Sequence, residues 1–329
     1  MKRWKGVLAL SSLSALLMGA LALGIALGAV PVSPLDKDPT NRLILLHIRL
    51  PRVLLAALVG GALGLCGAVM QGLFRNPLAD PYLLGIASGA TAGAALVIAL
   101  HLEVYYWGFV PLGAFLGGVL AVTIVYRVAQ TRWARLDNYA LILSGVALAA
   151  LFSAVTSFLL FYAGAAHDAR RVIFWILGGL GGAQWLYVLG VLGTLLIVGA
   201  TLVLFARELN ALALGEEMAA HLGIEPRHLR KILLFAVTLL TAVAVAVSGT
   251  IGFVGLIVPH ILRLIVGPDH RVLLPASALG GAVLLTLCDA VARTVLAPAE
   301  LPIGIITALL GAPFFLFLLR RRAQPGVTL

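Results

Sequence analysis

The chain has 329 residues, of which 62% are hydrophobic and 11% are charged, and its formal net charge is +10. A water-soluble domain ordinarily carries about twice that charged fraction, so the composition excludes one and predicts a protein whose solvent is the lipid bilayer. The positive charge does not indicate binding to nucleic acid, because the basic residues separate apolar runs instead of forming a patch.

Apolar runs with polar breaks follow one another along the whole chain. Crossing roughly 30 Å of hydrocarbon takes about 20 residues per helix, so this length has room for about ten spans and short connections. We therefore predict an all-α, polytopic membrane protein with a single transmembrane domain over residues 1–329. The spans are expected near residues 6–30, 52–73, 82–101, 105–126, 138–163, 183–205, 229–249, 258–267, 272–294 and 302–319.

Two of these runs depart from an ordinary span. The first follows a basic N-terminus and looks like a signal peptide, but it exceeds the apolar region of about 7 to 15 residues in a cleavable signal, so we expect an uncleaved helix. The eighth is short and follows the glycine-rich stretch 249–255. Such a break is tolerated at membrane depth only where the freed backbone groups are buried in protein or line a cavity.

The placement of Lys and Arg predicts the orientation. With the N-terminus in the cytoplasm, sixteen of the 23 basic residues fall on the cytoplasmic side. This excess supports an even number of spans with both termini cytoplasmic, and a bacterial inner membrane as the location. The seven that fall outside, where the rule disfavours them, are Lys37, Arg42, Arg49, Arg52, Arg170, Arg171 and Arg293.

Two of these outer arginines stand at the start of the second expected span. Arg49 and Arg52 flank Leu50 and Pro51, and Pro51 suits the first turn of a helix. Being three residues apart, the two arginines face the same way. They could snorkel to lipid headgroups, or they could offer a bidentate site to carboxylates of a docking protein, and the residues alone leave both open.

The stretch 212–226 is the one substantial polar insertion on the cytoplasmic side, and it predicts a short helix. Glu216 and Glu217 favour the first turn of a helix, and Gly223 suits a left-handed stop. Met218, Leu222 and the alanines Ala219 and Ala220 give this helix an apolar side. A helix that docks into a partner's groove and a solvated loop helix both fit these residues.

Asp289 is the one acidic residue well within an expected span. A charge near the bilayer centre costs on the order of 2.5 to 3.5 kcal/mol, so the residue should be paired or functional. Arg293 is four residues further on, which puts both side chains on one helix face. We expect an intramembrane ion pair in preference to a proton relay.

Residues for chemistry are scarce. The seven histidines show no metal-ligand spacing, and Cys66 and Cys288 lie inside apolar runs, where packing is the expected role. No phosphate-binding loop of the form GxxxxGK[ST] occurs, so the chain does not hydrolyse ATP through such a loop. We predict no catalytic residue, no metal site and no bound cofactor.

Four stretches together resemble the permease family of ABC importers for ferric siderophores, haem and cobalamin. They occur in the same order as in that family, and the resemblance covers nearly the whole chain. The stretches are residues 49–52, residues 67–81 with 83–89 just after them, residues 252–260, and residues 300–304 through 311–313.

The resemblance implies ten helices per subunit, a homodimer of permeases, two ATPase subunits that use ATP and Mg²⁺, and a periplasmic binding protein. It also implies that residues 212–223 form the segment that couples to the ATPase, with contacts from Gly215 to Ala220, Leu222 and Gly223. Arg49, Arg52 and Arg293 match positions that receive acidic side chains of the binding protein. The substrate path is expected at the dimer axis, along the spans that hold residues 139–162 and 303–317.

The expected function is therefore a transport subunit without an ATPase site of its own. It would carry a ferric siderophore, haem or cobalamin from the periplasm to the cytoplasm by alternating access. An ion-coupled secondary transporter is the alternative, and it would need intramembrane carboxylates, of which only Asp289 is present.

Overall fold

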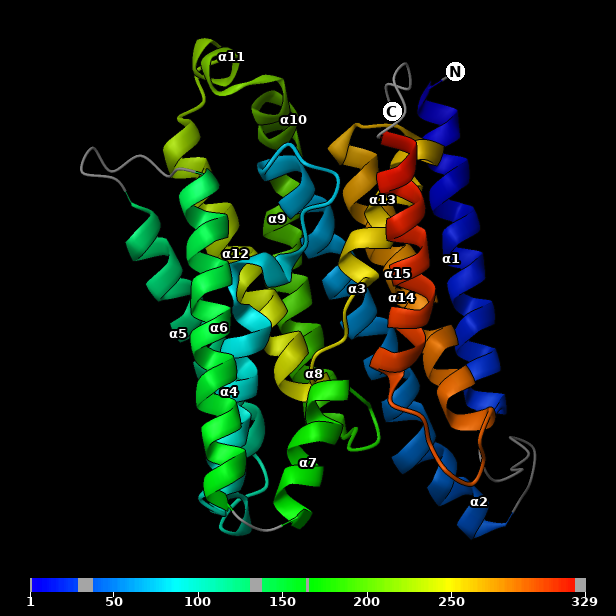
Figure 1. The fold of residues 1–329 in the computed structure, drawn as a ribbon. Helices are drawn as coiled ribbons and strands as arrows, with labels where there is room; N and C mark the ends of the chain where they lie inside the picture. Colours follow the sequence, from blue (N-terminus) through cyan, green and yellow to red (C-terminus); the bar gives the residue numbers. More distant parts are fainter. Residues whose placement is uncertain (1, 29–37, 131–137, 164–165, 323–329) are drawn as a thin grey trace.

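The computed structural model describes residues 2–28, 38–130, 138–163 and 166–322, which are helical with no strand (Figure 1). Seven helices are long and apolar enough to cross a membrane, and three shorter apolar helices accompany them, which confirms the predicted all-α polytopic fold. Lys37, Arg132 and Arg135, counted for the orientation, lie outside the described residues, as does the predicted end of the first span. The seven spanning helices contain α1 (Lys2–Ala26), α3 (Leu50–Leu73), α5 (Phe109–Ala129), α6 (Asn138–Ala163), α8 (Trp185–Thr194), which runs on to Leu204, α12 (Pro226–Ser248) and α14 (His270–Thr294). The three shorter apolar helices are α4 (Ile86–Ala99), α13 (Val254–Val266) and α15 (Ile303–Arg322).

The second span begins earlier than predicted. Helix α2 (Pro39–Leu43), the π-helical turn η1 (Ile44–Arg49) and α3 run on without a break. Pro51 therefore lies inside a long helix and not at its start. The wide turn just before it, in which the amide of Leu50 bonds to the carbonyl of Leu45, accommodates a residue that has no N–H to donate. Arg49 and Arg52 consequently project from the middle of a helix.

Close glycine contacts hold α3 at the centre of the bundle. A Cβ atom on Gly64 would lie 2.2 Å from the carbonyl oxygen of Ser277 in α14, and one on Gly67 would lie 1.9 Å from that of Gly255 in α13. Glycine is required at both positions because the backbones themselves touch. Small residues at such crossings are the usual means by which helices associate in a bilayer, where lipid competes for apolar contacts.

The glycine-rich break after α12 is buried, as the sequence predicts. The Ser248 carbonyl accepts from the amide of Gly179 at 2.8 Å. The hydroxyl of Tyr82 donates to the Ile251 carbonyl at 3.0 Å, and Thr250 donates its hydroxyl to the Ile176 carbonyl. These contacts satisfy backbone groups that an unbroken helix would have paired, so the interruption is tolerated inside the bundle.

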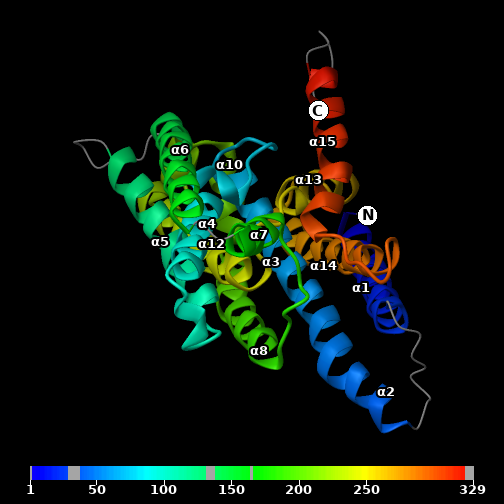
Figure 2. The same ribbon diagram turned by 60° about the horizontal axis from the view of Figure 1, so that its bottom comes forward.

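The bundle has two distinct ends. Figure 1 places the start of α1, the end of α15 and the short helix α11 (Glu216–His221) together at one end, which we call the α11 end. Helix α2 lies at the opposite end, which we call the α2 end. Helix α7 (Ala166–Leu177) lies toward the α2 end and packs against α4 and α6. In Figure 2, α15 stands clear of most of the bundle.

Candidate functional site

The predicted coupling segment forms the projecting end of the molecule. Helix α10 (Ala206–Leu214) is followed by Gly215, whose φ of +130° turns the chain, and then by the six residues of α11. Gly223, with φ of +79°, ends the segment in the left-handed region, as the sequence predicts. A short helix with Glu216 and Glu217 in its first turn is therefore present where it was expected.

The side chains of α11 divide between the chain itself and solvent. Glu216 pairs with Arg230 of α12 at 2.8 Å, and Ala219 is fully buried. Met218 and Leu222 are 50% and 61% exposed, so the predicted apolar side of this segment has no cover from the described residues except at Ala219. An open hollow of about 1120 Å³ lies beside the helix. It is lined by Arg75, Leu214, Gly215, Glu216, Glu217, Met218, Ala220, His221, Pro226, Arg227 and Arg230.

A set of hydrogen bonds joins α10 to α14 close to this segment, and the sequence analysis did not predict it. Asn210 donates its side-chain amide to Asp269 at 2.7 Å and accepts from the backbone amide of His270 at 2.9 Å. Burial opposes ionisation of Asp269, but the hydrogen bonds from Asn210 and from the backbone amide of Arg271 outweigh it and hold the pKa of this carboxyl below its ordinary value. The charged Asp269 thus caps α14 and joins it to α10.

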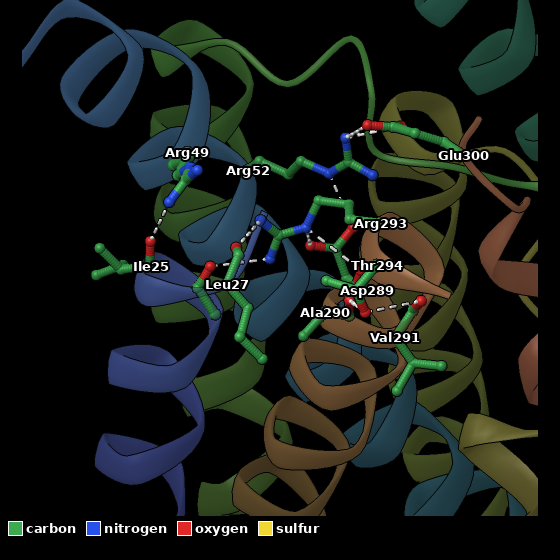
Figure 3. Close-up of polar contacts among 11 residues, drawn as sticks. Ile25, Leu27, Arg49, Arg52, Asp289, Ala290, Val291, Arg293, Thr294 and Glu300 are labelled. Atoms are coloured by element: carbon green, nitrogen blue, oxygen red, sulfur yellow. Dashed lines mark hydrogen bonds and ion pairs between the residues drawn. The ribbon is translucent and has the colours of Figure 1, made fainter. Parts of the chain in front are cut away.

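A buried ionic network occupies the α2 end (Figure 3). Asp289 lies between two guanidinium groups, with Arg52 Nε 2.8 Å from Oδ1 and Arg293 Nε 2.9 Å from Oδ2. The predicted ion pair of Asp289 with Arg293 is therefore present, with Arg52 as a third member. Arg52 also donates through Nη1 to both carboxylate oxygens of Glu300 at 2.9 Å.

The same network closes the end of α1. Arg293 donates to the carbonyls of Gly24 and Leu27 at 3.0 and 2.9 Å, and Arg49 donates to those of Ile25 and Ala26 at 3.0 and 3.2 Å. The last carbonyls of a helix have no intrahelical donor and carry the negative end of its dipole. Two arginines from distant parts of the chain satisfy all four.

The outer arginines are less accessible than the sequence suggested. Snorkelling to headgroups and docking to a partner both call for exposed side chains, but Arg49, Arg52 and Arg293 are only 4%, 6% and 4% exposed. They are buried because they cap α1 and neutralise carboxylates within the chain. Their docking role stays a prediction. Glu300, which sequence reasoning placed in a family stretch but gave no role, is the member of the network that reaches solvent, with its side chain 43% exposed.

Two adjoining hollows lie between α6 and α15. One, of about 530 Å³, is bordered by α15, and the other, of about 370 Å³, is bordered by α6. Gly252 and Phe253, from the break between α12 and α13, line both hollows. Phe253 has φ of +69° and packs on Gly311, where an added Cβ would lie 2.2 Å from its ring. The two predicted path helices therefore flank a continuous concave face.

The described residues hold no group of three or more His, Cys, Asp or Glu side chains that could bind a metal ion. Cys66 and Cys288 are buried free thiols. The sites that the structure does present are surfaces and a concave face: the α11 end, the network at the α2 end, and the hollows between α6 and α15.

Comparison with known proteins gives a consistent picture. The model of the FecCD transport family matches residues 7–321. The cobalamin import system permease protein BtuC of Halobacterium salinarum is 47% identical over 86% of this chain and 75% of its own. The hemin transport system permease protein HmuU of Yersinia pestis is 44% identical over 94% of each chain.

A solved structure agrees with these relatives. A metal-chelate type ABC transporter in an inward-facing conformation superposes with a TM-score of 0.86 at 35% identity, over 95% of this chain and 98% of that one. The helix count, the glycine-rich break and these matches along nearly the whole length lead to one conclusion: this chain belongs to the FecCD transport family, as a polytopic membrane permease of ABC importers.

Proposed function

We propose that this chain is the permease of an ATP-driven importer that carries cobalamin, haem or a ferric siderophore from the periplasm to the cytoplasm of a bacterial cell. The observation that carries the proposal is α11. It is a short helix with a well-formed turn at each end, and Met218 and Leu222 are left exposed on it. An uncovered apolar side is unfavourable in solvent, and it suits a groove on a partner subunit.

The α11 end is accordingly the cytoplasmic end, where two ATPase subunits would use ATP and Mg²⁺. Both chain termini would then lie in the cytoplasm, and the network at the α2 end would lie in the periplasm. Arg49, Arg52 and Arg293 would there meet acidic side chains of a periplasmic binding protein. Because Glu300 already occupies Arg52, docking would involve an exchange of one carboxylate for another.

The substrate path would be completed by a second copy of the chain. The concave face between α6 and α15 is open on one side, and both helices expose large apolar side chains, including Phe161 at 85% and Leu309 at 70%. A homodimer related by a twofold axis would bring two such faces together, since symmetric oligomers use the same patch on both subunits. Gly252 and Phe253 would then lie beside the path.

Cysteine cross-linking tests the dimer. Leu309→Cys on α15 should form a disulfide-linked dimer in membranes, whereas Ile197→Cys in η4 (Leu195–Gly199), a residue that is 73% exposed, should not. The two native cysteines are buried, so they add little background. Equal cross-linking at both positions, or none at Leu309, would argue against this interface.

Transport itself is tested in liposomes that contain this chain, its ATPase and its binding protein. Radiolabelled cobalamin, haem and a ferric siderophore are offered in turn, with ATP on the ATPase side and with ion gradients collapsed by ionophores. We expect uptake of one class that stops with a catalytically dead ATPase. Uptake that persists without ATP hydrolysis and disappears with the ion gradient would favour the ion-coupled alternative.

A further inference from the structure

A groove between α5 and α12 lies apart from every site described above. Its α12 wall is formed by residues 228, 231, 232, 234, 235, 238 and 239, which repeat at three and four residues and so share one helix face. Its α5 wall is formed by residues 115, 119, 122, 123 and 126, which also share one face. The groove therefore extends along several turns of both helices.

The groove has the size of a ligand site and lies at bilayer depth. Its volume is about 520 Å³, within the range of roughly 300 to 1,000 Å³ for small-molecule pockets. From His228 to Leu239 it extends over eleven residues of α12, about 16 Å at 1.5 Å per residue. Both helices are among those long and apolar enough to span a membrane. The groove therefore faces lipid for most of its length.

One end of the groove is polar and basic. His228 and Lys231 lie in the first two turns of α12, and the hydroxyl-bearing Tyr126 lies in the last turn of α5, so all three belong to the same end. His228 and Lys231 are exposed, and no acidic residue lines the groove. Within the described residues Lys231 forms no ion pair. Deeper in, the lining is apolar apart from two threonines, of which Thr238 bonds to the Leu234 carbonyl of its own helix.

We propose that this groove is a binding site for one anionic phospholipid. An acyl chain lies along the apolar walls, and Lys231 and His228 hold the phosphate, with the Tyr126 hydroxyl as a further donor. Charge is the reason for choosing an anionic headgroup, since a zwitterionic lipid would bring its own cation to a basic rim that lacks a carboxylate. Basic pockets between spans recognise lipid headgroups in this way. The inference requires only that the bundle spans a membrane, and it does not depend on the transported substrate.

The depth of the groove separates this site from ordinary lipid contact. Lipid that merely surrounds a helix is held by its apolar surface and shows little headgroup preference. Here the apolar channel fixes one chain while two basic side chains sit at its mouth, so chain and headgroup contribute together.

Native mass spectrometry of the purified full chain tests the proposal, with phosphatidylglycerol and phosphatidylcholine of matched acyl chains as probes. The wild type should bind one phosphatidylglycerol about thirtyfold more tightly than phosphatidylcholine, which is the preference that two basic groups near an anionic headgroup would give. The variant with Lys231→Gln and His228→Gln should lose most of that preference. Arg207→Gln, which removes an exposed charge on α10 at the same end, should keep it.

A second variant tests the acyl channel. Val119→Trp fills the groove midway along α5, so it should reduce binding of phosphatidylglycerol at this site although both basic side chains remain. Unchanged binding in Val119→Trp would mean that a phosphate is held at the rim without a chain, and it would overturn the lipid site. The proposal would also be overturned by equal affinities of the wild type for the two lipids, or by a protein dimer that Val119→Trp dissociates.

Discussion

Asp289 offers the sharpest test of how the α2 end is stabilised. Its side chain is fully buried and lies within 3 Å of two guanidinium groups, those of Arg52 and Arg293. Removing one partner of a buried ion pair costs about 3–5 kcal/mol, because a charge is left uncompensated. Glu300 still compensates Arg52, so we expect Asp289→Ala to cost about 3 kcal/mol.

The measurement is the melting temperature of the purified chain in detergent. At about 2 °C per kcal/mol, a value suited to long chains, Asp289→Ala should melt about 6 °C below the wild type. Asp289→Asn keeps the shape and one acceptor oxygen, so it should lose less. The matched control is Thr286→Val, on the same helix, where a buried hydroxyl has no hydrogen-bond partner among the described residues. It should melt within about 1 °C of the wild type.

A rescue variant separates charge from packing. Replacing a whole buried ionic cluster by apolar residues of similar size is often neutral. The triple variant of Arg52→Met, Asp289→Leu and Arg293→Met should therefore recover most of the loss, although the carbonyls of α1 lose one cap. If Asp289→Ala melted at the same temperature as the wild type, or if the triple variant melted no higher than Asp289→Ala, the charge argument would be wrong.

Three further predictions follow from the same structure. Glu217→Lys should reduce uptake and ATPase binding in liposomes. Glu217 is preferred to Glu216 for this test because the Glu216 carboxylate pairs with Arg230, so a change there would also break an ion pair within the chain. The control Glu225→Lys should leave uptake and ATPase binding near normal. Glu300→Gln removes the ion pair between Glu300 and Arg52 Nη1, so it should tighten docking of an acidic binding protein. The affinity should rise about two- to fivefold, which is the value of a partly exposed ion pair. The control Glu103→Gln, which removes the partner of Arg171 at the same end, should leave the affinity unchanged. Asn210→Ala should lower the melting temperature at pH 7, because it removes a hydrogen bond to the charged Asp269. The pKa of Asp269 is lowered in the folded chain, so the difference in melting temperature from wild type should be full above about pH 4 and should shrink as the pH falls further. A difference that stays constant with pH would contradict the role of this hydrogen bond.

The sequence predicts the helices well because each span is an independent apolar run. The thickness of the hydrocarbon core sets the length of each span, and charged residues mark the breaks between spans. Ten helices can therefore be counted without tertiary information. The α11 segment is predicted equally well, since Gly215 and Gly223 mark its ends and its acidic residues mark its first turn. Local chemistry decides these features, and local chemistry is visible in a sequence.

The environment of the outer arginines could not be predicted in the same way. The positive-inside rule identifies Arg52 and Arg293 as unusual, but burial depends on contacts across the chain. Arg52 meets Asp289 and Glu300, both more than 230 residues away, and Arg293 meets the end of α1. The start of α3 was misplaced for a related reason: Pro51 is a start signal, and only the preceding π-helical turn lets the helix pass through it.

The two ends of the molecule are joined by one helix pair. Asp269, which caps the start of α14, is bonded to α10 beside the coupling segment, and α14 carries Asp289 and Arg293 near its other end. Between these points the backbone of α14 touches that of α3, and a Cβ atom on Gly64 would overlap the Ser277 carbonyl. Contacts this close resist sliding, because packed interiors do not deform continuously.

Under the proposed function, α3 and α14 would move as a unit when the ATPase displaces α11. Arg52 is carried by α3 and Asp289 by α14, so the ion pair between them joins the two helices at the α2 end just as the glycine contacts join them in the middle. The concave face lies elsewhere, along α6 and α15, and α15 has few neighbours (Figure 2). Under the same proposal, a change in the position of α15 would open and close the path more easily than a separation of α3 from α14.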